Sequence, residues 1–284
     1  MRNQSARNRR PKLRLLSNFF AKRPPLLVVS FPKSGRTWLR VMLDDLGVNA
    51  AYTHDGSDHK ELRDIAQIST DKSRYKRQRI LFLTRDPRDT VVSGYFQVCK
   101  RHQLGAGPIG ECVRSPKHGV EKIALFNLQW FAAASYMRKI ALLRYEDMQR
   151  DTNDALRSVG NFVGKSFDES NLADVVVSRS FKRMQQSEIS GELGARYGGK
   201  LRPRNPDDPE SFKVRKGKVG GYLDYLSVDD VAFCDNVLAR LDYWKRLDEA
   251  FLRHGISYIG DRGRCELIRC IGLSADADIA ARRR

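Results

Sequence analysis

Residues 33–37, K-S-G-R-T, place a lysine, an arginine and two hydroxyl groups around the single glycine of a short loop. The apolar run before this loop, residues 26–31, has the composition of a strand buried on both faces of a parallel sheet. After the loop, apolar residues recur at the spacing of one helical face. A turn between such a strand and helix points backbone N–H groups at one spot, where the Lys33 ammonium adds a full charge. This arrangement suits a phosphate group.

The loop differs from the Walker A loop of P-loop enzymes. The Walker pattern, G-x-x-x-x-G-K-[S/T], places its lysine after the second glycine. Here Lys33 precedes the only glycine of the loop. An ordinary turn with a solvated lysine is the alternative to a phosphate site.

Two further apolar segments, residues 79–84 and 139–145, predict more parallel strands. With the helical segments between them, they predict a single α/β domain in which helices flank a central parallel sheet. Arg85 directly follows the second strand, and Ser93 lies about two turns into the next helix. Ligands of such sheets bind beyond the carboxyl ends of the strands, so we expect Arg85 and Lys33 on the same edge. A surface ion pair with Asp89 is the alternative interpretation of Arg85.

Two of the five histidines, His54 and His59, lie in a polar segment after the first predicted helix. His54 follows a short candidate strand, which would return it to the sheet edge that carries Lys33. A neutral imidazole can accept a proton from a hydroxyl group near pH 7. We therefore interpret His54 as a general base, with His59 and Asp55 as the alternatives.

Four motifs follow one another along the chain: P-K-S-G-R-T-W from Pro32, R-D-P-R-D-T-V-V-S from Arg85, R-Y-E-D from Arg144 and R-K-G from Arg215. Their order, over about residues 26–245, resembles the sulfotransferases that use 3′-phosphoadenosine 5′-phosphosulfate (PAPS). The resemblance implies the P-loop-kinase-like sulfotransferase fold and transfer of a sulfuryl group to an acceptor hydroxyl. The chain departs from the family in having Arg36 where threonine is commoner and in lacking H-T-H before the histidine. It also lacks a convincing dimerisation motif, which leaves the oligomeric state open.

The resemblance further implies a role for each motif residue. Lys33 would offset the charge on the departing 5′-phosphate, and His54 would be the catalytic base. The 5′-phosphosulfate would be bound by Lys33, Ser34, Gly35, Arg36 and Thr37. The 3′-phosphate would be bound by Arg85, Ser93, Arg215, Lys216 and Gly217. The adenine would lie against Trp38, Tyr145 and Phe181, with core packing as the alternative for the first two. No metal ion is implied.

The 284-residue chain has a net charge of +18, most of which lies near its ends. Residues 1–23 hold eight Lys/Arg and no acid, and residues 282–284 are arginines, which leaves a surplus of seven elsewhere. We predict a basic N-terminal tail (1–25), a sulfotransferase domain (26–260) and a C-terminal tail (261–284). This tail could contact nucleic acid or an anionic membrane, and a merely solvated tail is the alternative. The surplus on the domain needs no specific nucleic acid, because an anionic cofactor accounts for it.

No apolar run approaches the roughly 18 residues that a membrane-spanning helix requires. The five cysteines form no C-x-x-C pair, which favours reduced thiols and a cytoplasmic location.

The acceptor is expected to be a hydroxyl group of a small molecule, lipid or carbohydrate. Its pocket is expected to come from residues 52–60, 96–120 and 198–212. The last segment is polar with three prolines, and it predicts a mobile loop that buries little. Two other functions stay open at this point: a nucleoside-phosphate kinase or other P-loop enzyme, and a basic binding module without catalysis.

Overall fold

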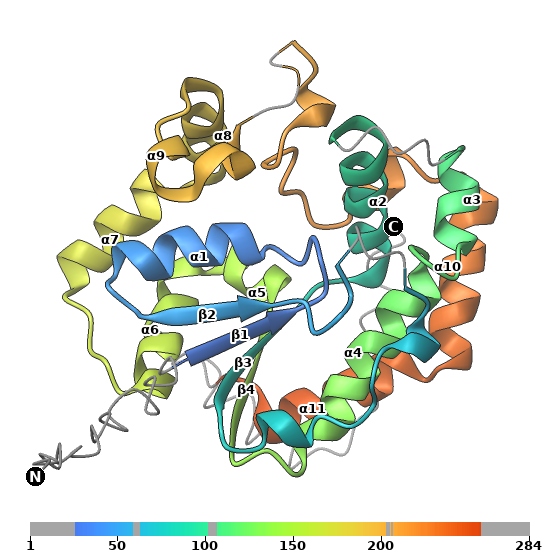
Figure 1. Cartoon of the computed structure of the whole chain (residues 1–284), viewed down its shortest axis with the longest axis horizontal. Helices are drawn as coiled ribbons and strands as arrows, with labels where there is room; N and C mark the ends of the chain where they lie inside the picture. Colours follow the sequence, from blue (N-terminus) through green and yellow to red (C-terminus); the bar gives the residue numbers. More distant parts are fainter. Residues whose placement is uncertain (1–25, 59–62, 102–106, 203–204, 206, 257–284) are drawn as a thin grey trace, which may run out of the picture.

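The computed structural model describes residues 26–58, 63–101, 107–202, 205 and 207–256. Its centre is a four-stranded parallel sheet in the order β2-β1-β3-β4 (Figure 1). The strands are β1 (Leu26–Ser30), β2 (Ala50–Thr53), β3 (Arg79–Thr84) and β4 (Lys139–Arg144). The three strands predicted from apolar runs are confirmed, and the candidate strand before His54 is the edge strand β2.

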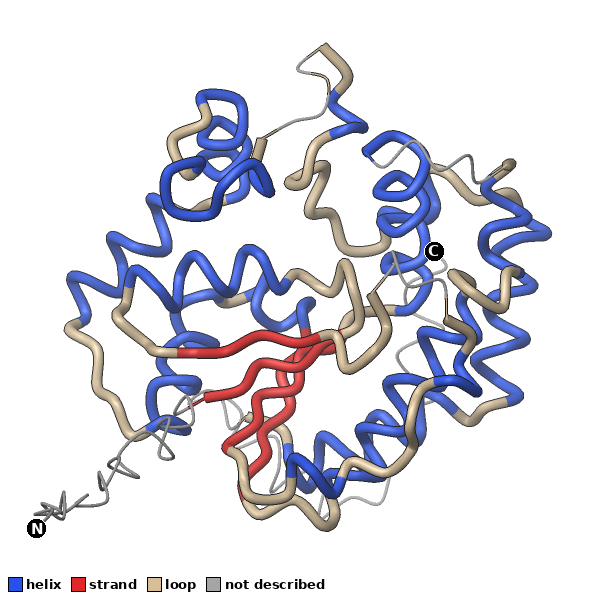
Figure 2. The backbone as a smooth tube through the Cα atoms, in the orientation of Figure 1, coloured by secondary structure: helices blue, strands red, loops and turns tan. Residues whose placement is uncertain are grey.

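Helices cover both faces of the sheet because its strands are apolar on both sides. Ile80 and Phe82 point into one core cluster, and Leu81 and Leu83 point into the opposite one. The helices on the first face are α2 (Pro87–Phe96), α3 (Ile109–Arg114), α4 (Val120–Ala134), α10 (Val228–Arg240) and α11 (Tyr243–His254). Those on the second face are α1 (Arg36–Asp45), α5 (Tyr145–Arg150), α6 (Thr152–Val163) and α7 (Glu169–Ser178). The tube in Figure 2 shows the small twisted sheet enclosed between these helices. The predicted α/β fold is confirmed.

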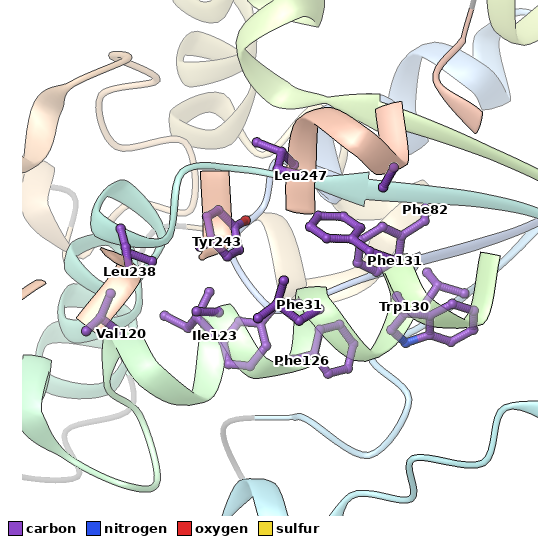
Figure 3. Packing of buried hydrophobic residues seen from close by; sticks show 14 of the residues in the cluster. Phe31, Phe82, Val120, Ile123, Phe126, Trp130, Phe131, Leu238, Tyr243 and Leu247 are labelled. Carbon is purple, nitrogen blue, oxygen red and sulfur yellow. The ribbon is translucent and has the colours of Figure 1, made fainter. Parts of the chain in front are cut away.

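The first core cluster is built on aromatic side chains from α4 (Figure 3). Trp130 stacks on Phe82 of β3 with ring centroids 5.6 Å apart, and Phe126 meets Phe31 edge-to-face at 5.4 Å. Such contacts add roughly 0.5–1.5 kcal/mol per pair beyond the burial of apolar area. Phe31 immediately precedes the loop of residues 32–35, so this packing fixes the point where the loop leaves the sheet.

A smaller helical group lies beyond α1 and contains α8 (Phe181–Ser190) and α9 (Gly194–Tyr197). The 3₁₀ turns η4 (Gly198–Leu201) and η5 (Pro209–Ser211) follow. Leu201 packs with Met184 of α8 and Val41 of α1, and Phe212 is also buried. The prediction that residues 198–212 bury little is therefore wrong in the described part of this segment. Its apolar residues are too widely spaced for a sequence pattern to reveal.

The chain ends are outside the described residues, and so is the predicted domain boundary at residue 260. Among the helices that the structure describes, none is both long enough and apolar enough to cross a bilayer.

Candidate active site

A cavity of about 850 Å³ opens where β1, β2 and β3 end. Thirteen of the fourteen predicted site residues line it, although they are spread along the chain from the first loop to the R-K-G motif. They are Lys33, Gly35, Arg36, Thr37, Trp38, His54, Arg85, Ser93, Tyr145, Phe181, Arg215, Lys216 and Gly217. Ser34 is the exception, because its side chain is buried and does not reach the cavity wall. The fold thus brings the four motifs to one place.

The loop of residues 32–35 turns sharply enough to aim the first amides of α1 into the cavity. Lys33 and Gly35 both have left-handed backbone angles, with φ of 74° and 93°. A Cβ atom on Gly35 would lie 2.4 Å from Cδ2 of Tyr145, so a larger residue cannot fit there. Backbone amides of a helical first turn lack partners within the helix and favour an anion. The loop and helix therefore form a cradle for a phosphate group.

The Lys33 ammonium donates to Oε1 of Gln97 over 3.2 Å. Gln97 begins a π-helical turn, η3 (Gln97–Arg101), that follows α2 without a break. Such turns are rare and occur often at functional sites. Here the turn carries Gln97, from the segment 96–120 expected to border the acceptor pocket, to the cavity; its contact with Lys33 was not predicted, because a π turn has no clear sequence signal.

Arg85 is nearly buried where β3 meets α2. Its guanidinium donates to the carbonyl oxygens of Lys33 (3.4 Å) and Lys218 (3.1 Å) and lies over the Tyr145 ring. The ion pair with Asp89 that served as the alternative interpretation is present at 3.7 Å, but both side chains are buried and line the cavity. The Nε atom of Arg85 has no hydrogen-bond partner among the described residues. A buried donor without a partner is costly, and an anion in the cavity would relieve that cost.

Residues 213–222, here called the strap, close one side of the cavity. Asp89 accepts hydrogen bonds from the amides of Gly220 and Tyr222, each at 2.9 Å. Glu188 of α8 accepts from the amides of Lys213 (2.7 Å) and Val214 (2.8 Å). Two buried carboxylates thus fix the backbone of the strap at its two ends.

The R-K-G motif forms the middle of the strap. The Arg215 guanidinium donates to Glu210 (2.7 Å) and to the Tyr225 hydroxyl (2.6 Å), and it stacks on Phe96. Lys216 lies 3.4 Å from Asp224, and a hydrogen bond with Tyr225, together with this carboxylate, raises the pKa of the lysine. Both cations reach the cavity wall but are held by neighbours within the strap region.

The predicted adenine residues have both packing and cavity-lining roles. Tyr145 is buried, and its hydroxyl donates to the carbonyl of Gly217 over 3.0 Å. Trp38 donates through Nε1 to the carbonyl of Arg179 and meets the Tyr145 ring edge-to-face. Phe181 packs against Gly217, where an added Cβ would lie 2.5 Å from its ring. The core-packing alternative for Trp38 and Tyr145 is therefore correct for part of each side chain, while another part lines the cavity.

His54 lies at the end of β2 between two hydrogen-bonding partners. Its Nδ1 atom is 2.9 Å from the carbonyl oxygen of Ser30, and Nε2 is 2.6 Å from the Arg36 guanidinium. A carbonyl only accepts and a guanidinium only donates, so the proton is on Nδ1 and Nε2 carries the lone pair. Burial and then the charge of Arg36 lower the pKa of His54 to about 3. The imidazole is neutral.

Asp55 is not placed to act as a base. Its carboxylate is 4% exposed and does not line the cavity. It pairs with the buried Lys72 ammonium at 2.7 Å and accepts hydrogen bonds from three further side chains, Arg74, Tyr75 and Trp130. This cluster anchors the turn that follows His54. The other alternative, His59, lies outside the described residues.

Further charged or polar side chains line the cavity, among them Arg40, Tyr52, Asp58 and Lys213. Tyr52 and Asp58 belong to the segment 52–60, which was expected to border the acceptor pocket, whereas Arg40 and Lys213 were not predicted. Arg40 is one helical turn after Arg36, and Tyr52 is two residues before His54 on the same side of a strand. Lys213 had no such signal, because a loop segment brings it to the cavity. Within the described ranges, no three His, Cys, Asp or Glu side chains are grouped closely enough to bind a metal ion.

Comparison with known proteins gives a consistent result. The family model for the sulfotransferase domain matches residues 23–248. A 3-alpha-hydroxysteroid sulfotransferase of Cavia porcellus is 22% identical over 253 residues, which cover 77% of this chain and 84% of that protein. Flavonol 3-sulfotransferase of Flaveria bidentis is 23% identical, covering 83% and 85% of the two chains.

Solved structures share the fold at lower identity. Mouse sulfotransferase SULT7A1 complexed with PAP superposes with a TM-score of 0.56 at 16% identity, covering 79% of this chain and 86% of that one. Retinol dehydratase in complex with androsterone and inactive cofactor PAP has a TM-score of 0.56 at 14% identity, with 84% of both chains covered. The family model spans most of the chain, and its motif residues meet in one cavity. This protein belongs to the sulfotransferase family.

Proposed function

We propose that the protein transfers the sulfuryl group of PAPS to a hydroxyl group of a small-molecule, lipid or carbohydrate acceptor. The observation that carries this proposal is the convergence of four separate motifs on one cationic cavity. The relatives described above are sulfotransferases, and two of the similar structures contain PAP, the desulfated form of PAPS. Membership of this family is also why we prefer sulfuryl transfer to the kinase alternative.

The cavity suits a nucleotide with phosphate groups at two positions. The amides at the start of α1 and the Lys33 ammonium would bind the 5′-phosphosulfate. At the other side, Arg85 lines the cavity together with Ser93 and the strap, and the 3′-phosphate would fit there beside the guanidinium, whose Nε has no partner among the described residues. Such charge-assisted hydrogen bonds are about twice as strong as neutral ones. PAPS supplies an activated sulfuryl group, and the protein's part is to position the acceptor and to offset charge.

Lys33 would act on the leaving group. Its ammonium already lies at the loop that would hold the 5′-phosphate, and Gln97 fixes its direction. A positive charge beside the bridging oxygen offsets the negative charge that grows there as the S–O bond breaks. Ser34 belongs to this loop, and its side chain is buried, so the contribution of the side chain would be to support the loop through packing.

His54 would accept the proton of the acceptor hydroxyl through Nε2. The hydrogen bond between Nδ1 and Ser30 keeps the lone pair on Nε2 directed toward the cavity. The Arg36 guanidinium donates a hydrogen bond to that lone pair. Arg36 therefore has to turn away before Nε2 can accept a proton from the acceptor. A sulfuryl group bound at the nearby cradle would offer Arg36 an anionic partner and so free the base. Donor binding would thereby prepare the site for the acceptor.

Nucleotide binding tests the proposal first. We expect PAP to raise the melting temperature of the protein, and ATP with Mg²⁺ to leave it nearly unchanged, because ligands stabilise only in proportion to their affinity. Incubation with ³⁵S-labelled PAPS and a cell extract should then yield labelled products. Stabilisation by PAP without any labelled product would favour the binding module, and stabilisation by ATP with Mg²⁺ alone would favour a P-loop enzyme.

A further inference from the structure

The wall of the cavity around His54 is cationic. Arg36 contacts Nε2 of His54 directly, and Arg40 lies one turn further along α1 with its guanidinium 4.0 Å from the centre of the Tyr52 ring. Lys213 reaches the same region from the strap, and its charge contributes to the lowered pKa of His54. Among the described residues, the carboxylate that lines this part of the cavity is Asp58.

Two polar atoms in this region are buried without a hydrogen-bond partner in the described structure, Nη1 of Arg36 and the hydroxyl oxygen of Tyr52. Burial and then the charge of Arg40 lower the pKa of Arg36 to about 10. The two arginines therefore destabilise each other in a place with little water. An unpaired buried donor typically costs about 1–3 kcal/mol, and more when it is charged. An anion bound between them would remove this cost.

The charges of PAPS do not account for these cations. The strap and β3 supply their own cations for the nucleotide, and most have a carboxylate partner: Asp89 for Arg85, Glu210 for Arg215, and Asp224 for both Lys216 and Lys218. Nine Lys/Arg side chains line the cavity; against them stand the lining carboxylates Asp58 and Asp89 and the partners Glu210 and Asp224, which leaves a surplus of five. PAPS carries about four negative charges, about two of them on the 3′-phosphate. About one positive charge is therefore left after the donor has bound, and on the His54 side Arg36, Arg40 and Lys213 stand against the carboxylate of Asp58.

From this surplus, and on the basis of the proposed function, we propose that the acceptor is itself an anion. It is a hydroxyl compound that carries a carboxylate, sulfate or phosphate group close to the reacting hydroxyl. Arg40 and Lys213 bind that group, while Arg36 is shared between it and the donor. The names of the two relatives given above refer to a steroid and a flavonol, so this acceptor class would differ from theirs.

Separation of acceptors by charge tests the inference. A small-molecule cell extract is divided on an anion exchanger into a retained acidic fraction and an unretained fraction. Each is incubated with the full-length protein and ³⁵S-labelled PAPS, and transfer of label is measured. We expect at least about tenfold more transfer to the acidic fraction, since one ionic contact of this kind contributes roughly 1.5–3 kcal/mol. Treating that fraction with phosphatase or with sulfatase beforehand identifies which anion is required, and resistance to both indicates a carboxylate.

Two variants provide a matched control. Arg40→Gln removes a charge near His54, and Lys218→Gln removes one from the strap. Arg40→Gln should raise the KM for the acidic fraction about tenfold while the Kd of PAP, measured by calorimetry, changes less than about twofold. Lys218→Gln should raise the Kd of PAP, while the KM for the acidic fraction changes less than about twofold. Lys213→Gln repeats the first test with a side chain outside α1, in case Arg40→Gln lowers the melting temperature.

Equal or greater labelling of the unretained fraction overturns the inference and leaves the sulfotransferase activity standing. An unchanged KM in both Arg40→Gln and Lys213→Gln also overturns it. If PAP binds but neither fraction is labelled, the proposed transferase activity fails and the inference fails with it.

Discussion

The guanidinium of Arg36 lies 2.6 Å from Nε2 of His54, on the lone pair that a general base would use. Arg36 stands where the sulfotransferase motif more often has threonine. The substitution therefore changes the charge next to the predicted base as well as the donors available to a phosphosulfate. It links the two halves of the site, because one side chain can contact either the base or an anion in the cradle.

The pKa of His54 should depend on Arg36. In the wild type it is lowered to about 3, so NMR should show no titration of this ring between pH 5 and 8. In Arg36→Gln the pKa should rise, yet stay below 6.5, because burial is the larger cause and persists. Arg40→Gln should move it less, since Arg40 does not contact the ring. Titration of wild-type His54 near pH 6.5 would contradict the arrangement seen here.

The same shift has a consequence for stability. The unfolded chain, in which histidine has a pKa near 6.5, binds this proton more tightly than the folded chain. The contribution of His54 to the free energy of unfolding should therefore be present above pH 6.5 and be lost as the pH falls from 6.5 toward about 3. Urea denaturation at several pH values, compared between wild type and His54→Asn, measures this contribution. Equal pH dependence in the two proteins would show that the ring is not held neutral.

Removal of the proposed base should affect turnover more than binding. His54→Ala should lower kcat about 10²–10⁴-fold, the usual range for acid–base catalysis, while the Kd of PAP stays within about twofold. His118→Ala serves as the control because His118 does not line the cavity. The activity of this variant should remain near that of the wild type. Full activity of His54→Ala would assign proton transfer to another group.

Arg85 should distinguish nucleotides by their 3′-phosphate. Arg85→Ala should weaken the binding of PAP by about ten- to a hundredfold more than the binding of AMP, which lacks that phosphate. Arg88, in the same R-D-P-R-D segment, pairs with Asp86 and Asp235 at 2.8 Å each and does not line the cavity. Arg88→Ala should therefore leave the difference between the binding of PAP and the binding of AMP unchanged. Calorimetric titration of both nucleotides gives the comparison, and an equal loss in Arg85→Ala would place the 3′-phosphate elsewhere.

Gly35 should be intolerant of any side chain. Its added Cβ would lie 2.4 Å from the Tyr145 ring, which cannot retreat easily because its hydroxyl is bonded to Gly217. Gly164 provides the control: it has a φ of 77°, similar to the 93° of Gly35, but nothing lies within 4 Å of its added Cβ. Gly164→Ala should cost about 1 kcal/mol from backbone strain alone, and Gly35→Ala clearly more. Chemical denaturation measures both, and equal losses would refute the steric contact.

The sequence alone determined the strands, the loop and the order of the motifs. Each of these is local: a short apolar run makes a buried strand, and a glycine with a following amphipathic segment makes a turn into a helix. Lys33 and Arg85 each follow a parallel strand closely, and the carboxyl ends of parallel strands share one edge. Their meeting at that edge could therefore be predicted from the order of the residues.

The tertiary structure decided what surrounds His54. From the sequence, the Arg36 side chain was expected to contact a phosphate group. The pairing of β2 with β1 brings His54 next to Arg36 instead. Asp55 was an alternative base by its position in the sequence, but the packing of Lys72, Tyr75 and Trp130 around it makes it an anchor. Lys213 reaches the site because Glu188, 25 residues earlier, holds the backbone of the strap. Contacts between distant segments depend on how whole helices pack, and no local pattern of residue types specifies them.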